Sequence, residues 1–170
     1  MDFTDTFAPV VKLGTIRAVL QLAASRAWPV HQLDVSNAFL HGHLAEQVFC
    51  QQPTGFVDTT LPDHVCLLSR SLYGLKQAPR AWYQWIAAFL QQQGFRITRS
   101  DASLFVYRQG AATAYLLLYV DDIILTASST ALLQQITARL GHEFALKDLG
   151  ALHYFLGIEV VRRDTDFFLH

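Results

Sequence analysis

The sequence has little charge and no excess of either sign. Of its 170 residues 16% are charged, and 13 Lys and Arg stand against 14 Asp and Glu, which gives a formal net charge of −1. This balance excludes a strongly basic protein that coats nucleic acid, and also an acidic solubilising protein. Any grip on nucleic acid must then come from a local basic patch or from other parts of a longer protein. A hydrophobic share of 52% excludes a disordered tail and allows one sizeable core.

Cysteine, leader and membrane signals are also scarce. The two cysteines, Cys50 and Cys66, are expected to be reduced thiols inside a cell, although their spacing also allows a disulfide. The first residues, MDFTDTFAPV, lack the basic and apolar regions of a signal peptide. The most apolar stretch, residues 114–127, is too short to cross a membrane and carries two adjacent acids at its centre. We therefore expect no membrane partner.

No repeat or linker divides the chain, so residues 1–170 are expected to form a single domain. Apolar residues at helical spacing predict helices over residues 12–27, 79–93 and 130–140. Alternating or apolar runs predict strands over residues 30–35, 47–52, 65–74, 103–108, 113–120, 122–127 and 152–162, with a hairpin partner beginning at 166. The alternation predicts an α+β fold in which helices back an antiparallel sheet.

Two adjacent acids, Asp121 and Asp122, interrupt the apolar strand residues. Neighbouring carboxylates between apolar strands repel each other and resist desolvation. A hairpin tip normally carries Asn-Gly or Asp-Gly rather than Val-Asp-Asp-Ile. A divalent cation is the simplest agent that would hold this charge, and carboxylate oxygens suit Mg²⁺. The alternative is a solvated turn, which the apolar flanks disfavour.

The spacing of the acids limits which of them can share a site. A regular strand would point Asp121 and Asp122 to opposite faces, with Asp121 ranked first as the metal ligand, whereas a tight hairpin tip would let both reach it. Asp34 is the best third ligand, because it lies near the end of the strand 30–35, where a short helical turn begins. Its alternative role is to cap that turn, and the residues alone favour neither reading.

Four segments, in order, resemble the motifs of copia-type retrotransposon reverse transcriptases. They are QLDVSNAFLHG, SLYGLKQAPRAWY, YVDDIILTAS and LKDLGALHYFLGIEV. One such motif is weak evidence, but four in the right order and at the right intervals are highly specific. The resemblance covers nearly the whole chain, and it implies a polymerase palm with part of the fingers: an antiparallel sheet backed by helices, related to the split βαβ arrangement. A basic upstream fingers segment, a thumb and an RNase H domain are expected to be absent from this sequence.

The resemblance implies an RNA-directed DNA polymerase that adds deoxynucleotides to a primer 3′-OH and releases pyrophosphate. Its partners would be an RNA or DNA template, a DNA- or tRNA-type primer, deoxynucleoside triphosphates and the remaining domains of the polyprotein. Two Mg²⁺ ions, or Mn²⁺ in their place, would stabilise the attacking and leaving oxygens. The family further implies an intracellular location, in a cytoplasmic virus-like particle.

The resemblance also implies roles for individual residues. The catalytic residues would be Asp34, Asp121, Asp122 and Lys147, of which Lys147 protonates the leaving pyrophosphate. The metal ligands would be the three aspartates and the backbone carbonyl of Val35. The nucleotide-binding residues would be Val35, Asn37, Ala38, Phe39, Tyr73, Gly74 and Lys76. The primer-gripping hairpin would consist of Tyr154, Phe155, Leu156 and Gly157.

Several of these positions have a plainer alternative. Phe39 would exclude a ribose 2′-OH by its bulk, or it is an ordinary core phenylalanine. Many retroviral enzymes have Gln where Tyr73 stands, so a hydrogen bond there is not implied. Lys76 could meet template or triphosphate, or it could lie in a solvated helix start. The primer-gripping segment could be a plain core strand.

Two other function classes use the same residues. A catalytically silent palm remnant could bind nucleic acid or a partner through exposed aromatics, for which Tyr107, Tyr115 and Tyr119 are the candidates, although burial is expected for most of them. A metal-dependent phosphohydrolase could use the same aspartates. The seven histidines show no metal-ligand spacing, and the closest pair, His41 and His43, falls in an expected turn.

Overall fold

The computed structural model describes residues 9–44, 46–156, 158–162 and 167–169. The helices are α1 (Leu13–Ser25), the short 3-10 helix η2 (Ala38–His41), α2 (Ala78–Gln92) and α3 (Thr130–Glu143). The strands are β1 (Val30–Val35), β2 (Phe49–Gln51), β3 (Val65–Leu67), β4 (Phe95–Ile97), β5 (Leu104–Gln109), β6 (Ala112–Tyr119), β7 (Asp122–Ala127), β8 (Leu146–Ala151), β9 (Tyr154–Phe155), β10 (Ile158–Arg162) and β11 (Phe167–Leu169). Helices and strands alternate, which confirms the α+β prediction.

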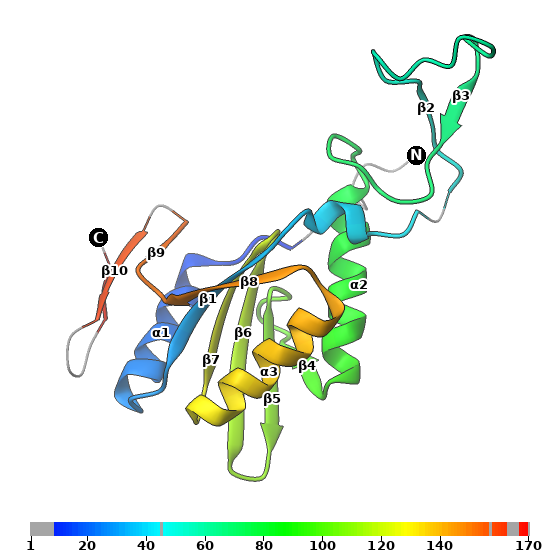
Figure 1. Ribbon diagram of the computed structural model, residues 1–170. Helices are drawn as coiled ribbons and strands as arrows, with labels where there is room; N and C mark the ends of the chain where they lie inside the picture. Colours follow the sequence, from blue (N-terminus) through cyan, green and yellow to red (C-terminus); the bar gives the residue numbers. More distant parts are fainter. Residues whose placement is uncertain (1–8, 45, 157, 163–166, 170) are drawn as a thin grey trace.

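The centre of the molecule is a six-stranded sheet in the order β4-β5-β6-β7-β1-β8 (Figure 1). Every neighbouring pair in this sheet is antiparallel. Because β1 lies between β7 and β8, the first strand of the chain becomes a neighbour of strands that lie about a hundred residues later. This crossing brings the end of β1 to the start of β7.

Helices α2 and α3 cover one face of the sheet. Each has one apolar side, and the buried residues of α2 include Trp82, Ile86 and Leu90. These side chains pack with Leu33, with the inward residues of β6 and β7, and with the apolar side of α3 in one cluster of buried residues. Burial of this surface is the main source of the sheet's stability, since burying one large apolar side chain contributes roughly 2 kcal/mol.

Helix α1 covers the opposite face. Its buried residues Ile16, Val19, Leu20 and Ala23 pack with side chains from β1, β6, β7 and the segment around β9 and β10 in a second cluster. The start of α1 is held by Asp101, whose carboxylate accepts hydrogen bonds from the Lys12 backbone N–H (3.0 Å) and the Thr15 hydroxyl (2.6 Å). The sheet is therefore enclosed by helices on both faces.

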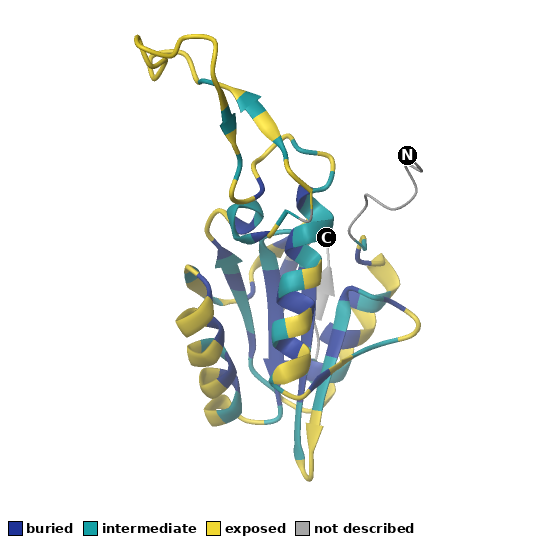
Figure 2. Cartoon of the chain, turned by 90° about the vertical axis from the view of Figure 1, so that its right-hand side faces the viewer, coloured by how far each residue is buried: buried dark blue, intermediate teal, exposed yellow. Residues whose placement is uncertain are grey.

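The β2–β3 hairpin projects away from this body and is mostly exposed (Figures 1 and 2). Cys50 and Cys66 lie opposite each other in its register, and both are free thiols. Phe49 and Leu67 also pair in register and are exposed. The described residues include no helix that is both long enough and apolar enough to span a membrane.

The observed elements differ from the predicted ones in four places. The strand expected over 65–74 ends at Leu67, because the chain turns towards the start of α2 and Gly74 takes a φ of 91°. The strand expected over 152–162 is split by a turn in which Leu156 takes a φ of 50°. Strands β4 and β8, both at the edges of the sheet, were not predicted, because β4 has only three residues and β8 has no regular apolar alternation.

Candidate active site

The first two predicted ligands meet where β1 ends and β7 begins. Asp34 and Asp122 are directly opposite each other in the antiparallel register. Side chains of directly opposed residues point to the same face of a sheet. Both residues are half-buried. Asp34 does not cap the helical turn that follows, because the N-cap of η2 is Asn37 and no side chain caps it.

The turn between β6 and β7 holds Asp121 beside this pair. Tyr119 pairs with Asp122, so Val120 and Asp121 form a two-residue hairpin loop. Val120 has a φ of 54°, a region that a β-branched residue rarely adopts. Two hydrogen bonds fix the turn: the Trp82 indole N–H donates to the Val120 carbonyl (2.6 Å), and the Val35 N–H donates to the Asp121 carbonyl (2.9 Å). Strain of this kind persists only where the surroundings over-determine the backbone.

The electrostatics of the pair disfavour ionisation of Asp122. Burial raises the pKa of Asp122, a hydrogen bond from Gln32 opposes this, and the negative charges of Asp121 and then Asp34 raise it further. The Gln32 side-chain amide donates to the Asp122 carboxylate at 3.3 Å. The pKa of Asp122 is therefore raised above the ordinary value of an aspartic acid. A cation placed here would reverse that effect.

The donor set fits a hard divalent cation in its chemistry. Carboxylate oxygens from Asp34, Asp121 and Asp122 are the ligands that Mg²⁺ takes, with waters and substrate phosphates completing the shell. Among the described residues, no group of three His, Cys, Asp or Glu side chains is already arranged to hold a metal ion. The mutual repulsion that raises the pKa of Asp122 is itself a reason for the side chains to stay apart until a cation neutralises them.

The predicted nucleotide-binding residues lie in two segments: one runs from the end of β1 into η2, and the other is in the turns before α2. Asn37, with a φ of 55°, precedes η2, which carries buried Ala38 and half-buried Phe39. The rings of Phe39 and Tyr73 are in contact, with centroids 4.8 Å apart. Tyr73 is exposed, and the next residue is Gly74, in the left-handed region. The structure thus joins two segments that the sequence separates by more than thirty residues.

A hollow of about 240 Å³ adjoins Phe39 and the strained turn at Val120. Its lining residues are Pro9, Phe39, Pro79, Trp82, Tyr83, Leu118 and Val120. Lys76 lies at an exposed position in the turns that lead into α2. Phe39 lines this hollow and also packs against the main core. Its surroundings therefore agree in part with a residue that meets the nucleotide and in part with an ordinary core phenylalanine.

Lys147 lies directly opposite Asp34 on β8, on the other side of β1 from Asp122. It is exposed and shares the face of the sheet that carries Asp34. The next residue of β8, Asp148, forms an ion pair with His31 (3.1 Å) when that histidine is protonated. The structure therefore places the predicted proton donor next to a predicted metal ligand.

The predicted primer-gripping hairpin is a hairpin, but it is not beside the acids. Tyr154 and Phe155 form β9, Phe155 is buried with α1, and Leu156 lies in the turn. Gly157 lies outside the described residues. The segment leaves the sheet where the Leu152 N–H donates to the Val30 carbonyl, at the opposite end of β1 from Asp34.

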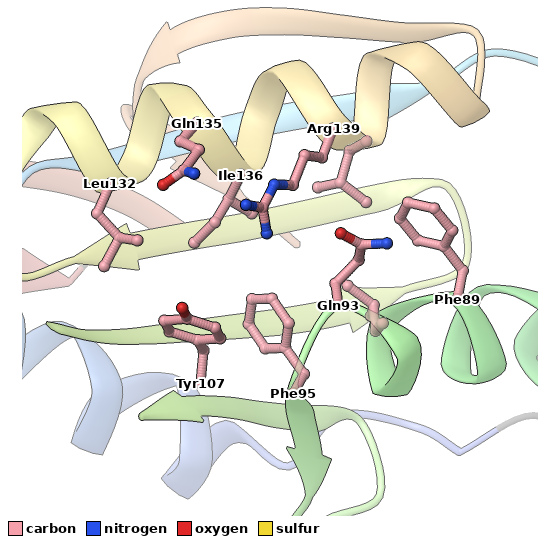
Figure 3. A pocket seen from close by; sticks show the side chains of 10 residues that line it. Phe89, Gln93, Phe95, Tyr107, Leu132, Gln135, Ile136 and Arg139 are labelled. Atoms are coloured by element: carbon pink, nitrogen blue, oxygen red, sulfur yellow. The ribbon is translucent and has the colours of Figure 1, made fainter. Parts of the chain in front are cut away.

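A second hollow, of about 310 Å³, lies between α2 and α3 (Figure 3). Side chains from both helices and from β4 and β5 line it, among them Phe89, Tyr107, Ile136 and Arg139. No acidic residue lines it. This second hollow is therefore separate from Asp34, Asp121 and Asp122.

Two residues of the candidate site escaped the reading of the sequence. Gln32 precedes Asp34 by two positions, so strand alternation alone would have placed it on the same face. Trp82 was assigned only to the apolar face of its helix, and nothing in the sequence indicated that its indole N–H would reach the Val120 carbonyl. The aromatic candidates for stacking, Tyr107, Tyr115 and Tyr119, were expected to be mostly buried, and all three are half-buried.

The chain is similar along nearly its full length to known proteins. The family described as "Reverse transcriptase (RNA-dependent DNA polymerase)" matches residues 1–169. The Retrovirus-related Pol polyprotein from transposon RE2 of Arabidopsis thaliana is 49% identical over 162 residues, which are 95% of this chain and 11% of the relative. The corresponding polyprotein from transposon TNT 1-94 of Nicotiana tabacum is 42% identical over 166 residues, which are 97% of this chain and 12% of the relative.

These relatives are much longer than this sequence, so the chain spans only about a tenth of each. No solved structure is significantly similar to it. The resemblance to retrotransposon reverse transcriptases that four ordered motifs indicated is confirmed by the match over residues 1–169 and by these relatives. The chain belongs to the reverse transcriptase family of RNA-dependent DNA polymerases.

Proposed function

We propose that this chain is the palm segment, with part of the fingers, of an RNA-directed DNA polymerase within a retrotransposon Pol polyprotein. The observation that carries the proposal is the pairing of Asp34 with Asp122 beside the strained turn at Asp121. Three acids from two distant motifs lie near one another at the ends of two inner strands, where the charges of Asp121 and Asp34 add to burial in disfavouring ionisation of Asp122. Such an arrangement destabilises a fold unless it serves a ligand.

In this proposal Asp34, Asp121 and Asp122 hold two Mg²⁺ ions, with the Val35 carbonyl as a further ligand. The bound ions would stabilise the attacking primer oxygen and the leaving pyrophosphate oxygens. The protein's contribution is to fix the acids: Trp82 and the Val35 N–H lock the turn, and Gln32 orients Asp122. Fixing the backbone that carries these acids in advance would lower the barrier, because the two strand ends need not be brought together during the reaction.

The contact between Phe39 and Tyr73 supports a nucleotide site next to the acids. Phe39 would meet the sugar of the incoming nucleotide and exclude a 2′-hydroxyl by contact. Backbone N–H groups of Asn37 and Ala38, at the start of η2, would face the triphosphate. Tyr73 and Gly74 would lie over the nucleotide, and Lys76 would meet phosphate or template.

Lys147 is proposed to protonate the leaving pyrophosphate. Its position opposite Asp34 on the neighbouring strand supports this role, because the leaving group departs close to the metal-binding acids. The ammonium group starts with the proton and ends neutral, and solvent returns the proton to it. The hairpin around Tyr154 stays a prediction as primer grip, as does the location in a virus-like particle.

Primer extension tests the proposal. The reverse transcriptase part of the polyprotein, with all its domains, is assayed on an RNA template with Mg²⁺ and deoxynucleotides. We expect Asp34→Asn and Asp121→Asn each to reduce extension by about 10²-fold or more, since charge stabilisation of a transition state is lost. The matched control is Glu143→Gln, an exposed acid at the end of α3. Normal extension by Asp121→Asn would show that the proposed function is wrong.

A further inference from the structure

The end of α1 is built to hold an arginine and a tryptophan in fixed positions. The Trp28 N–H donates to the Ala23 carbonyl and the Ala27 N–H donates to the Ala24 carbonyl, which together form a Schellman cap. Ala27 sits in the left-handed region, with a φ of 52°, where glycine is the usual residue. The positive φ of Ala27 turns the chain so that Trp28 packs back onto the sheet.

Trp28 and its neighbours form an ordered stack. The Trp28 ring stacks on Tyr115 of β6, with centroids 6.2 Å apart and planes at 28°. The Arg26 guanidinium lies over the Trp28 ring, 5.5 Å from its centroid. The indole therefore contacts both an aromatic ring and a cation, and the stack holds a charged group beside the sheet.

Two further arginines lie on the same face of the sheet. Arg96 on β4 pairs with Val106, which pairs with Tyr115, so one row of residues leads from Arg96 to the stack. Arg108 is two positions beyond Val106 on β5 and points to the same side. Their neighbours Phe95 and Tyr107 point to the opposite face, where their rings are in contact. We call Arg26, Arg96 and Arg108 the arginine surface.

Within the part of the chain that the structure describes, the strands that carry the arginine surface hold no acidic side chain. Residues 94–98, 104–109, 112–117 and 124–128, which make up this end of the sheet, contain no Asp or Glu. All three arginines are exposed. Like charges on neighbouring strands are unfavourable unless a partner of opposite sign binds. A charge on an edge strand discourages aggregation, which accounts for Arg96 alone, because β5 is an inner strand of the sheet.

We propose that the arginine surface binds the phosphate backbone of nucleic acid outside the catalytic edge. The β5–β6 turn lies at the end of the sheet opposite η2 (Figure 1). Thr113, which pairs with Arg108, is six residues along β6 from Tyr119, a separation of roughly 20 Å. A polymer that carries a charge at every nucleotide could contact both regions. Because the chain as a whole is near neutral, any electrostatic binding by this chain depends on such a local patch, apart from what other parts of a longer protein contribute.

The test measures binding separately from chemistry. The complete reverse transcriptase part of the polyprotein is titrated into a fluorescein-labelled RNA–DNA duplex, without divalent metal or nucleotides, at a series of salt concentrations. We expect Arg96→Gln and Arg108→Gln each to weaken binding and to reduce the slope of log affinity against log salt by about 1. The double variant should lower the slope by about 2, and Arg26→Gln should act in the same direction.

Controls separate the outcomes. Arg139→Gln on α3, on the other face of the sheet, should leave affinity and slope unchanged. Asp121→Asn should retain duplex binding, so a failed primer-extension test does not decide this one. Unchanged affinity and slope in the double variant would overturn the proposal. Poly-glutamate of matched charge serves as a competitor for the labelled duplex. If it displaces the duplex as well as unlabelled duplex does, the proposal is overturned, because the arginine surface would then be a site for acidic protein.

Discussion

Asp101, buried in the turn between β4 and β5, and Asp122, half-buried at the start of β7, are two acids with opposite environments. Asp101 accepts hydrogen bonds from the Lys12 N–H, the Thr15 hydroxyl and the Ser103 N–H at 2.6–3.0 Å. The Asp122 carboxylate accepts a hydrogen bond from the Gln32 amide at 3.3 Å, and Asp122 faces two other acids. One carboxylate is surrounded by donors and the other by charges of its own sign.

The pKa values move in opposite directions for this reason. Burial acts to raise the pKa of Asp101, but hydrogen bonds from Thr15, Lys12 and Ser103 outweigh it, and the pKa is lowered. For Asp122, burial and the neighbouring acids outweigh the hydrogen bond from Gln32, and the pKa is raised. Asp101 has the environment of a structural carboxylate, whereas that of Asp122 is costly to the fold and is expected at a site that binds a cation.

The largest expected effect separates the two acids by activity. In primer extension, Asp122→Asn should lose about 10²- to 10³-fold, because the site loses a charge that stabilises the metal. Asp101→Asn should lose no more activity than its folded fraction explains. The measurement is kcat per folded molecule, with folding followed by circular dichroism. Comparable losses per folded molecule in both variants would remove the functional distinction.

The next effect concerns stability, for which Asp101 should matter more than Asp122. Asp101→Ala should lower the free energy of unfolding by about 2 kcal/mol, since it leaves the Lys12 and Ser103 N–H groups without their acceptor at the start of α1. Urea denaturation measures the change. The matched control is Asp63→Ala in the exposed loop before β3, which should change stability by less than about 0.5 kcal/mol.

The third effect is a gain of stability. Asp122→Asn removes one of three like charges, and we expect it to stabilise the metal-free fold by about 0.5 kcal/mol, because solvent screens part of the repulsion. Urea denaturation in the presence of a chelator measures it. A loss of stability in Asp122→Asn would contradict the view that the ionised Asp122 side chain destabilises the metal-free fold.

Both differences should depend on pH, in opposite senses. Asp101 has a lowered folded pKa, so its stabilisation is present above the ordinary aspartate pKa and is lost as the pH falls through the folded value. Asp122 has a raised folded pKa, so wild type gains stability as the pH falls, and the advantage of Asp122→Asn should disappear once both side chains are neutral. Denaturation curves between about pH 3 and 7 test both signs.

Much of the fold followed from the sequence, because apolar periodicity is a local signal. The helix around Trp82 and the strands that flank Asp121 were predicted within a few residues. The edge strand β8 and the split at Leu156 were not, because their pairing depends on partners far along the chain.

The candidate site was predictable in its members but not in its geometry. The acids stood out because apolar residues flank them, and the ordered motifs indicated the third. The two-residue turn was only one of two alternatives, since Val120 is a poor residue for a positive φ and the strain is sustained by Trp82, from a different helix. The role of Asp101 gave no sequence signal, because its partners Lys12 and Thr15 lie almost ninety residues away.

The smallest expected effect is a shift in thermal stability with Mg²⁺. Because a cation neutralises the repulsion that destabilises ionised Asp122, Mg²⁺ should raise the Tm of wild type by about 2–4 °C at concentrations well above its dissociation constant. Asp122→Asn should show little shift, whereas Asp101→Asn should shift like wild type from a lower starting Tm. Equal shifts in all three proteins would place the bound cation elsewhere, so differential scanning fluorimetry with Mg²⁺ and with Na⁺ at matched ionic strength tests the acidic edge independently of catalysis.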